Sequence, residues 1–204
     1  MQSYYRQIRA MGTRLDMVFP GTGEEQGELV VALIDREVKR LEDMLSFFDP
    51  ASELSRINAA EPGSPVTVSA EMKQILIMVQ DYARKTGGYF DITSRPVSDW
   101  LKKNPGGETP PPDLIACTGM DKFEIEDHSL IRKAPGLILD PGGFGKGYAL
   151  EKVKQILHKT KIPCAFISFG ESSLYAHGHH PYGDFWIAGI NDPIDGSSTG
   201  YTFA

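Results

Sequence analysis

The chain has 204 residues, of which 41% are hydrophobic and 24% are charged, and its formal net charge is −6. This composition is typical of a globular protein, and the length suits one large domain or two small ones. The negative charge disfavours a nucleic-acid-binding or anionic-membrane-binding surface. No apolar run approaches the ~20 residues needed to span a bilayer. Cys117 and Cys164 lack the spacing of a zinc site.

The residue pattern of the N-terminal half predicts one strand followed mainly by helices. Residues 14–19 read as a strand that ends at a Pro-Gly pair. Apolar residues then recur every three or four positions over residues 24–48, which predicts a long amphipathic helix. A short helix over 52–58, a brief strand over 66–68 and a helix over 69–85 follow. Both of these helices begin at a serine that can cap them.

The C-terminal half predicts more strands than helices. Residues 104–112 are rich in proline and glycine and predict an exposed loop, and residues 122–133 predict a hairpin. Residues 137–140 predict a strand and residues 147–159 a helix. Further strands are predicted over 164–169, 186–190 and 199–203. Because strands and helices mix without strict alternation, we expect a single α+β domain over residues 1–204, with a mixed or antiparallel sheet packed against helices.

The stretch from Leu139 to Glu151 carries four glycines within six positions and opens the predicted helix. A strand, a glycine turn and a helix start can hold a phosphorylated ligand, with Lys146 at the helix N-terminus. It is not a Walker A loop, because Asp140 stands where the first glycine belongs and Gly147 replaces Ser or Thr. It is not a Rossmann fingerprint either, because Tyr148 stands where the third glycine belongs. The alternative is a tight connection without a ligand.

Two further segments carry candidate ligand-binding residues. In Gly87–Thr93 the aromatic residues Tyr89 and Phe90 precede Asp91, so aromatic faces could cover a flat heterocycle while the carboxylate accepts from a ring or ribose donor. The alternative is a helix cap followed by two core aromatics. Met11 could pack flat against an aromatic ring, or it could be a buried residue at a strand start.

Three other segments are open to two interpretations. Capping and turn chemistry explain most of the segment from Ser46 to Asn58, which includes Phe48. Gly170-Glu171 ends a buried strand and could either bind a polar ligand edge or form a plain turn. The closely spaced histidines His177, His179 and His180 could suggest a metal site. A solvated loop is favoured, because no cysteine or carboxylate cluster lies nearby in the sequence to complete a coordination shell.

Taken in order, six of these pieces resemble the ApbE-type FAD:protein FMN transferases, also called flavin transferases. The resemblance runs from residue 11 to residue 193 and covers nearly the whole chain. The six pieces are Met11–Thr13, residues 46–58, residues 88–93, residues 139–149, Ser168–Glu171 and Trp186–Pro193.

The resemblance implies an α+β fold, ApbE-like or T-fold-like, that binds FAD as substrate together with Mg²⁺. Its members attach FMN through a phosphoester to a Thr or Ser of an acceptor protein, at a site resembling Asp-x-x-Thr-Gly-Ala-Thr. Some members mainly hydrolyse FAD. Lys146 would neutralise the pyrophosphate, and the main-chain carbonyl of Gly143 would be a metal ligand. The residues implied to line the FAD site are Met11, Phe48, Tyr89, Phe90, Asp91, Asp140 and Lys146. No catalytic residue is assigned.

The sequence departs from the family pattern in three places. Phe48 stands where many members have Tyr, and Gly170-Glu171 replaces the commoner Gly-Gly. The family continues beyond the end of this chain with a His-Ile-x-x-Pro-x-x-Gly-like motif and a late Ala-Asp-x-x-x-Thr-like motif that supplies metal ligands. We therefore expect the chain to represent roughly the N-terminal two-thirds of such a domain, and to be weak or inactive in transfer unless a second polypeptide supplies those ligands.

The family resemblance leaves alternative functions open and implies a cellular compartment. The alternatives to a transferase are a non-catalytic module that binds flavin or a protein partner, and an FAD pyrophosphatase. The family implies the bacterial cell envelope or periplasm, with membrane anchoring of many members. The first residues, Met1 to Arg6, show no signal-peptide pattern.

Overall fold

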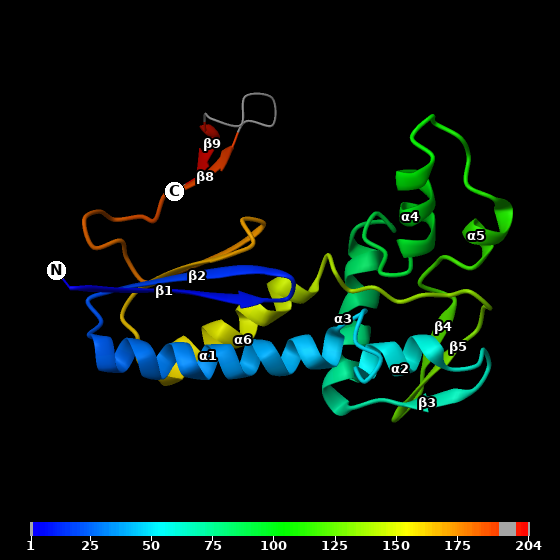
Figure 1. Cartoon of the computed structure of the whole chain (residues 1–204), viewed down its shortest axis with the longest axis horizontal. Helices are drawn as coiled ribbons and strands as arrows, with labels where there is room; N and C mark the ends of the chain where they lie inside the picture. Colours follow the sequence, from blue (N-terminus) through cyan, green and yellow to red (C-terminus); the bar gives the residue numbers. More distant parts are fainter. Residues whose placement is uncertain (1, 192–198, 204) are drawn as a thin grey trace. The chain divides into compact units, whose positions relative to one another are not determined.

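The computed structural model describes residues 2–191 and 199–203 and divides the chain into two compact units (Figure 1). The first unit combines Met1–Lys39 with Lys146–Ala204, and the second is Arg40–Gly145. Both contain helices together with sheets whose strands pair antiparallel, so the α+β prediction is confirmed. None of the helices in the described ranges is long and apolar enough to span a membrane.

The first unit is built on a four-stranded antiparallel sheet in the order β1-β2-β6-β7. Its strands are β1 (Ser3–Ala10), β2 (Thr13–Pro20), β6 (Ala165–Phe169) and β7 (Ser173–His177). Met11 and Gly12 join β1 to β2, with φ values of 48° and 72°. Two positive φ values in a two-residue loop make the tight hairpin turn whose twist suits antiparallel strands. A separate pair, β8 (Ala188–Asn191) with β9 (Thr199–Phe203), is also antiparallel.

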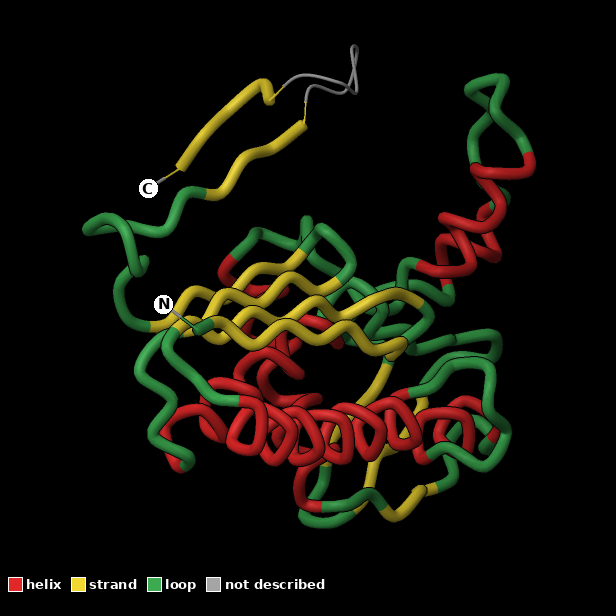
Figure 2. Tube along the Cα trace, turned by 60° about the vertical axis from the view of Figure 1, so that its left-hand side comes forward, coloured by secondary structure: helices red, strands yellow, loops and turns green. Residues whose placement is uncertain are grey.

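The core of the first unit lies between this sheet and two helices, α1 (Glu24–Leu45) and α6 (Gly145–Lys159). Figures 1 and 2 show both helices on the same face of the sheet. Alternate residues of the two central strands point to that face, as period-2 geometry requires. The buried residues are Leu15, Met17 and Phe19 of β2, Ala165, Ile167 and Phe169 of β6, Val30, Ile34 and Val38 of α1, and Ala149, Val153 and Leu157 of α6.

The second unit packs helices against a small sheet in the order β3-β5-β4. Its elements after α1 are α2 (Glu53–Ala59), β3 (Pro65–Thr67), α3 (Ala70–Lys85), α4 (Arg95–Lys103), α5 (Pro112–Ala116), β4 (Phe123–Ile125) and β5 (Ser129–Arg132). Ser52 and Ser69 cap α2 and α3 by accepting from Ser55 N and Met72 N, as the sequence predicts. The hairpin prediction over 122–133 is confirmed by the pairing of β4 with β5.

The strand predicted over residues 137–140 is wrong, because this segment is extended but pairs with no strand. Side chains supply the hydrogen bonds that a neighbouring strand would have made. The Asn58 amide donates to Leu139 O at 2.9 Å and accepts from Leu139 N at 2.9 Å. The buried Arg132 donates to Leu137 O, and also to Asn58 O and Ala60 O. The backbone of the segment is thus satisfied without a β-ladder.

Candidate functional site

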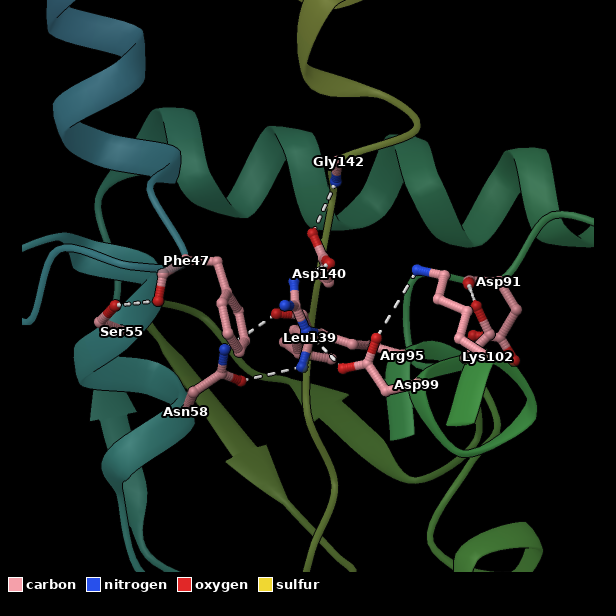
Figure 3. Close-up of polar contacts among 11 residues, drawn as sticks. Phe47, Ser55, Asn58, Asp91, Arg95, Asp99, Lys102, Leu139, Asp140 and Gly142 are labelled. Carbon is pink, nitrogen blue, oxygen red and sulfur yellow. Dashed lines mark hydrogen bonds and ion pairs between the residues drawn. The ribbon is translucent and has the colours of Figure 1, made fainter. Parts of the chain in front are cut away.

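A pocket of about 560 Å³ lies in the second unit, where the segment between α3 and α4, the helix α4 itself and the glycine turn come together. Its lining residues are Gly88, Tyr89, Phe90, Asp91, Ile92, Ser94, Arg95, Ser98, Asp99, Lys102, Asp140 and Gly143. Two segments far apart in the sequence, residues 88–102 and 140–143, therefore share one cavity. Figure 3 labels the charged residues that line it, which are Asp91, Arg95, Asp99, Lys102 and Asp140, together with some of their neighbours.

Asp91 is held by a turn of its own segment. Its Oδ1 accepts from Thr93 N at 2.7 Å and from Thr93 Oγ1 at 2.6 Å. Thr93 is buried, and its Oγ1 also accepts from Gly119 N at 2.6 Å. This is an Asx turn, in which a short carboxylate fixes its own backbone two residues on. The second oxygen of Asp91, Oδ2, accepts no hydrogen bond from any residue in the described ranges.

Asp140 is more fully engaged than Asp91. Its backbone N donates to Ile92 O at 2.7 Å, which ties the glycine turn to the segment that carries Asp91. Its Oδ1 accepts from Gly142 N at 2.9 Å, and its Oδ2 accepts from Arg95 Nη1 at 2.6 Å. Both carboxylate oxygens therefore have partners, and one partner is a cation.

Arg95 is one of the pocket residues that the sequence analysis missed, together with Asp99 and Lys102. Its Cζ lies 3.8 Å from the centroid of the Phe47 ring and 5.3 Å from that of Phe48. Its Nε lies 3.3 Å from Asp99 Oδ2, one turn along α4. A signal was present, since a cation in the first turn of a helix opposes the helix dipole and needs an anionic partner to offset it.

The aromatic residues predicted for the site have unequal exposure. Tyr89 is 98% exposed and Phe48 is 82% exposed, so both offer their faces to a ligand. Phe90 instead makes a T-shaped contact with Tyr82, with ring centroids 6.2 Å apart. Tyr89 lines the pocket, so its exposed ring is available to a ligand there.

The structure brings five of the predicted site residues to this pocket, and they are Tyr89, Phe90, Asp91, Asp140 and Gly143. Phe48 packs edge-on against Phe47, with centroids 5.4 Å apart. Met11 and Lys146 belong to the first unit: Met11 is in the β1–β2 turn and Lys146 is the second residue of α6.

The glycine turn leads directly into α6. Pro141 O accepts from Phe144 N and from Gly145 N, both at 2.8 Å, which starts the helical turn. A Cβ at Gly142 would lie 3.0 Å from Asp140 Oδ1, whereas one at Gly143 would have no atom within 4 Å. Gly142 is therefore needed for the close approach to the carboxylate, while Gly143 leaves open space on the pocket side.

The histidine segment carries no metal-site geometry. His177 Nε2 lies 3.1 Å from Ile162 O, and its ring is edge-on to His158 at 4.9 Å. In the described ranges, no group of three or more His, Cys, Asp or Glu residues is arranged to hold a metal ion. Gly170 and Glu171 form a turn with φ values of 59° and 56°, and Glu171 pairs with Arg14. Asp192 and Pro193, the end of the sixth motif, lie outside the described residues.

Comparison with known proteins identifies the family. The family model for ApbE matches residues 11–202. The chain belongs to the ApbE family. It is 31% identical over 160 residues to the FAD:protein FMN transferase of Chlamydia pneumoniae, covering 75% of this chain and 50% of that protein. It is 25% identical over 198 residues to the protein of the same name from Escherichia coli K12, covering 92% and 56%.

Solved ApbE structures share the fold. The flavin transferase ApbE from Vibrio cholerae superposes with a TM-score of 0.80 at 23% identity, covering 94% of this chain and 64% of that one. The ApbE protein from Thermotoga maritima gives a TM-score of 0.83 at 23% identity, covering 98% and 67%. This family member spans about half the length of the curated relatives it matches.

Proposed function

We propose that this protein binds FAD and, with Mg²⁺, transfers the FMN part of FAD to a Thr or Ser hydroxyl of an acceptor protein. The observation that carries the proposal is the pocket that residues 88–102 and 140–143 line together in a member of the ApbE family. Its volume of about 560 Å³ lies within the usual range for small-molecule sites.

Each proposed contact has a physical basis in the surroundings of the residue. Tyr89 and Phe48 expose aromatic faces that can stack on the isoalloxazine ring, and Phe90 lines the pocket. Asp91 keeps one carboxylate oxygen for a ring or ribose donor, because Thr93 engages only the other. Asp140 lines the same pocket from the glycine turn, and Lys146 follows it at the start of α6.

The transfer step conserves atoms without an oxidant or reductant. The acceptor hydroxyl oxygen attacks the phosphorus on the FMN side of the pyrophosphate, and the bond from that phosphorus to the bridging oxygen breaks. AMP leaves with the bridging oxygen, and the hydroxyl proton passes to a base. When bound, Mg²⁺ would neutralise charge on the phosphate oxygens as this bond breaks.

The residues of the pocket suit a metal held mainly by the substrate. Mg²⁺ is commonly bound through one or two carboxylates together with substrate phosphates and water. In this pocket the main-chain carbonyl of Gly143 would be one further oxygen ligand.

The test mixes the protein with FAD, Mg²⁺ and an acceptor protein that carries an Asp-x-x-Thr-Gly-Ala-Thr-like segment. Because we expect transfer by this chain alone to be weak, flavin fluorescence on the acceptor band after denaturing electrophoresis should stay well below that given by a full-length relative, and it should be lost when EDTA replaces Mg²⁺ or when valine replaces the acceptor threonine. Labelling at the rate of a full-length relative would contradict that expectation. Asp140→Asn should lower the signal, whereas Asp81→Asn, a substitution on α3 outside the pocket lining, should not. FAD binding with neither a labelled acceptor nor release of FMN and AMP would favour a non-catalytic flavin-binding module, and release of FMN and AMP without labelling would indicate a pyrophosphatase.

A further inference from the structure

Arg95 is held on three sides within the second unit. The Phe47 ring lies 3.8 Å from its Cζ, Asp140 Oδ2 lies 2.6 Å from Nη1, and Asp99 Oδ2 lies 3.3 Å from Nε. Figure 3 shows its side chain among these three residues. A planar cation held by a ring face and two carboxylates loses little further rotamer freedom when it binds a ligand.

The guanidinium still has donors to offer. It carries two N–H groups on each Nη and one on Nε. The carboxylates of Asp140 and Asp99 engage Nη1 and Nε, while no residue in the described ranges accepts a hydrogen bond from Nη2. Because Arg95 lines the pocket, these donors are available to a ligand that enters it.

The charges that line the pocket make the binding of an anionic ligand depend on Arg95. The lining contains three carboxylates, from Asp91, Asp99 and Asp140, against two cations, Arg95 and Lys102. The side chain of Lys102 is 77% exposed and its Nζ lies 3.7 Å from Asp99, so solvent screens most of its charge. The side chain of Arg95 is only 23% exposed. A phosphate in this pocket therefore depends on Arg95 to offset the carboxylates.

We propose that Arg95 binds a phosphate group of the flavin nucleotide and thereby selects FAD and FMN over riboflavin. The guanidinium fork matches two phosphate oxygens, and charge-assisted bonds of this kind are stronger than neutral ones. This inference rests on the proposed function, since it names the part of the substrate that one pocket residue recognises. It is independent of whether transfer follows binding.

The experiment measures the dissociation constants of FAD, FMN and riboflavin from flavin fluorescence, for the unaltered protein and for three variants. In Arg95→Gln the FAD and FMN constants should rise about 10- to 100-fold, while the riboflavin constant changes less than about two-fold. The FAD and FMN constants of Arg95→Lys should lie between those of the unaltered protein and those of Arg95→Gln, because lysine keeps the charge but lacks the planar fork of the guanidinium. Arg84→Gln is the matched control, since it removes the same charge from an exposed ion pair on α3 and should leave all three constants unchanged.

Each outcome decides something. An unchanged ratio of the riboflavin dissociation constant to the FAD dissociation constant in Arg95→Gln overturns the inference. If all three constants rise by the same factor, Arg95 supports the binding of the flavin ring instead. Circular dichroism and the melting temperature of each variant show whether the fold is retained, and Arg95→Lys keeps the test valid if Arg95→Gln is unfolded. If the unaltered protein binds none of the three flavins, the proposed function fails as well. If it binds FAD but transfers nothing, only the transfer is lost.

Discussion

Replacing Asn58 by alanine tests how the segment that carries Asp140 is held in place. The Asn58 amide makes two hydrogen bonds with the backbone of Leu139, one as donor and one as acceptor, each 2.9 Å long. Leu139 is buried, so water cannot replace either bond without opening the structure. Alanine keeps the α2 helix intact, because it is the best helix former, and removes only the amide.

The expected loss follows from these two bonds. A net hydrogen bond contributes about 1 kcal/mol, and a buried backbone group left without a partner costs about 1–3 kcal/mol. Two bonds to one buried residue therefore predict a loss of about 2–4 kcal/mol in the free energy of unfolding. Asn58→Asp should lose a similar amount, because a carboxylate can still accept from Leu139 N but faces Leu139 O without a proton to donate.

Urea denaturation followed by circular dichroism measures the loss. The matched control is Asn104→Ala, in which the lost side chain makes a single bond, 2.8 Å long, to Trp100 O at the end of α4. This control should lose no more than about 1 kcal/mol. Equal losses at the two positions, or a loss below about 0.5 kcal/mol for Asn58→Ala, would refute the argument that this amide substitutes for a neighbouring strand.

Four further predictions concern other residues. Arg132→Met should lower the free energy of unfolding by about 3 kcal/mol or more in urea titrations, because it leaves three main-chain carbonyls without their buried donor; a loss below about 1 kcal/mol would contradict this. Tyr89→Ala should change stability by less than about 0.5 kcal/mol but raise the FAD dissociation constant roughly 3- to 10-fold, and a changed melting temperature with unchanged affinity would exclude the stacking role. The melting temperature of Gly170→Ala should be lower than that of Gly63→Ala. Both glycines have a positive φ, but a Cβ at Gly170 would lie 2.8 Å from a neighbouring side chain, whereas a Cβ at Gly63 would have no atom within 4 Å. Burial raises the pKa of the Cys164 thiol, so iodoacetamide at pH 8 should alkylate it more slowly in the native protein than in urea, as followed by mass spectrometry.

The elements that the sequence predicted well carry local signals. The helix over 69–85 has a serine at its start, apolar residues at helical spacing and a glycine pair after its end, and α3 spans Ala70–Lys85 with Ser69 as its cap. Residues 164–169 form a short apolar run of the kind found in buried strands, and β6 spans Ala165–Phe169 at the centre of the sheet. In both cases the signal depends only on neighbours in the sequence.

The elements that were missed depend on distant partners. The edge strand β1 is mostly exposed and lacks a clear apolar alternation, so only its pairing with β2 defines it. The helix α4 spans nine residues and buries none of them, and its apolar stripe of Val97, Trp100 and Leu101 is too short for spacing alone to distinguish. The apolar run 137–140 looked like a strand because nothing in it reveals that Asn58 and Arg132 bond its backbone from other elements.

Several residues of the candidate site were predictable from the sequence, but Arg95 and the contacts of the carboxylates were not. Asp91 and Asp140 were marked by motif position, yet the structure gives them different surroundings. Thr93 engages one oxygen of Asp91, whereas Arg95 and Gly142 engage both oxygens of Asp140. Spacing cannot show that difference, because it arises where segments separated by about forty-five residues meet.

The contacts of residues 137–142 distinguish the residues that hold this segment in place from the residue that is proposed to bind the ligand. Arg132 and Asn58 hold Leu137 and Leu139, while Ile92 O and Arg95 hold Asp140. Substitutions of the first pair remove buried hydrogen bonds, so they should lower stability and displace Asp140 together. Substitution of Arg95 leaves the half-buried carboxylate of Asp140 without its cationic partner, so it can lower stability as well as affinity. The ratio of the riboflavin dissociation constant to the FAD dissociation constant therefore separates recognition from support, because a loss of stability alone weakens the binding of all three flavins alike.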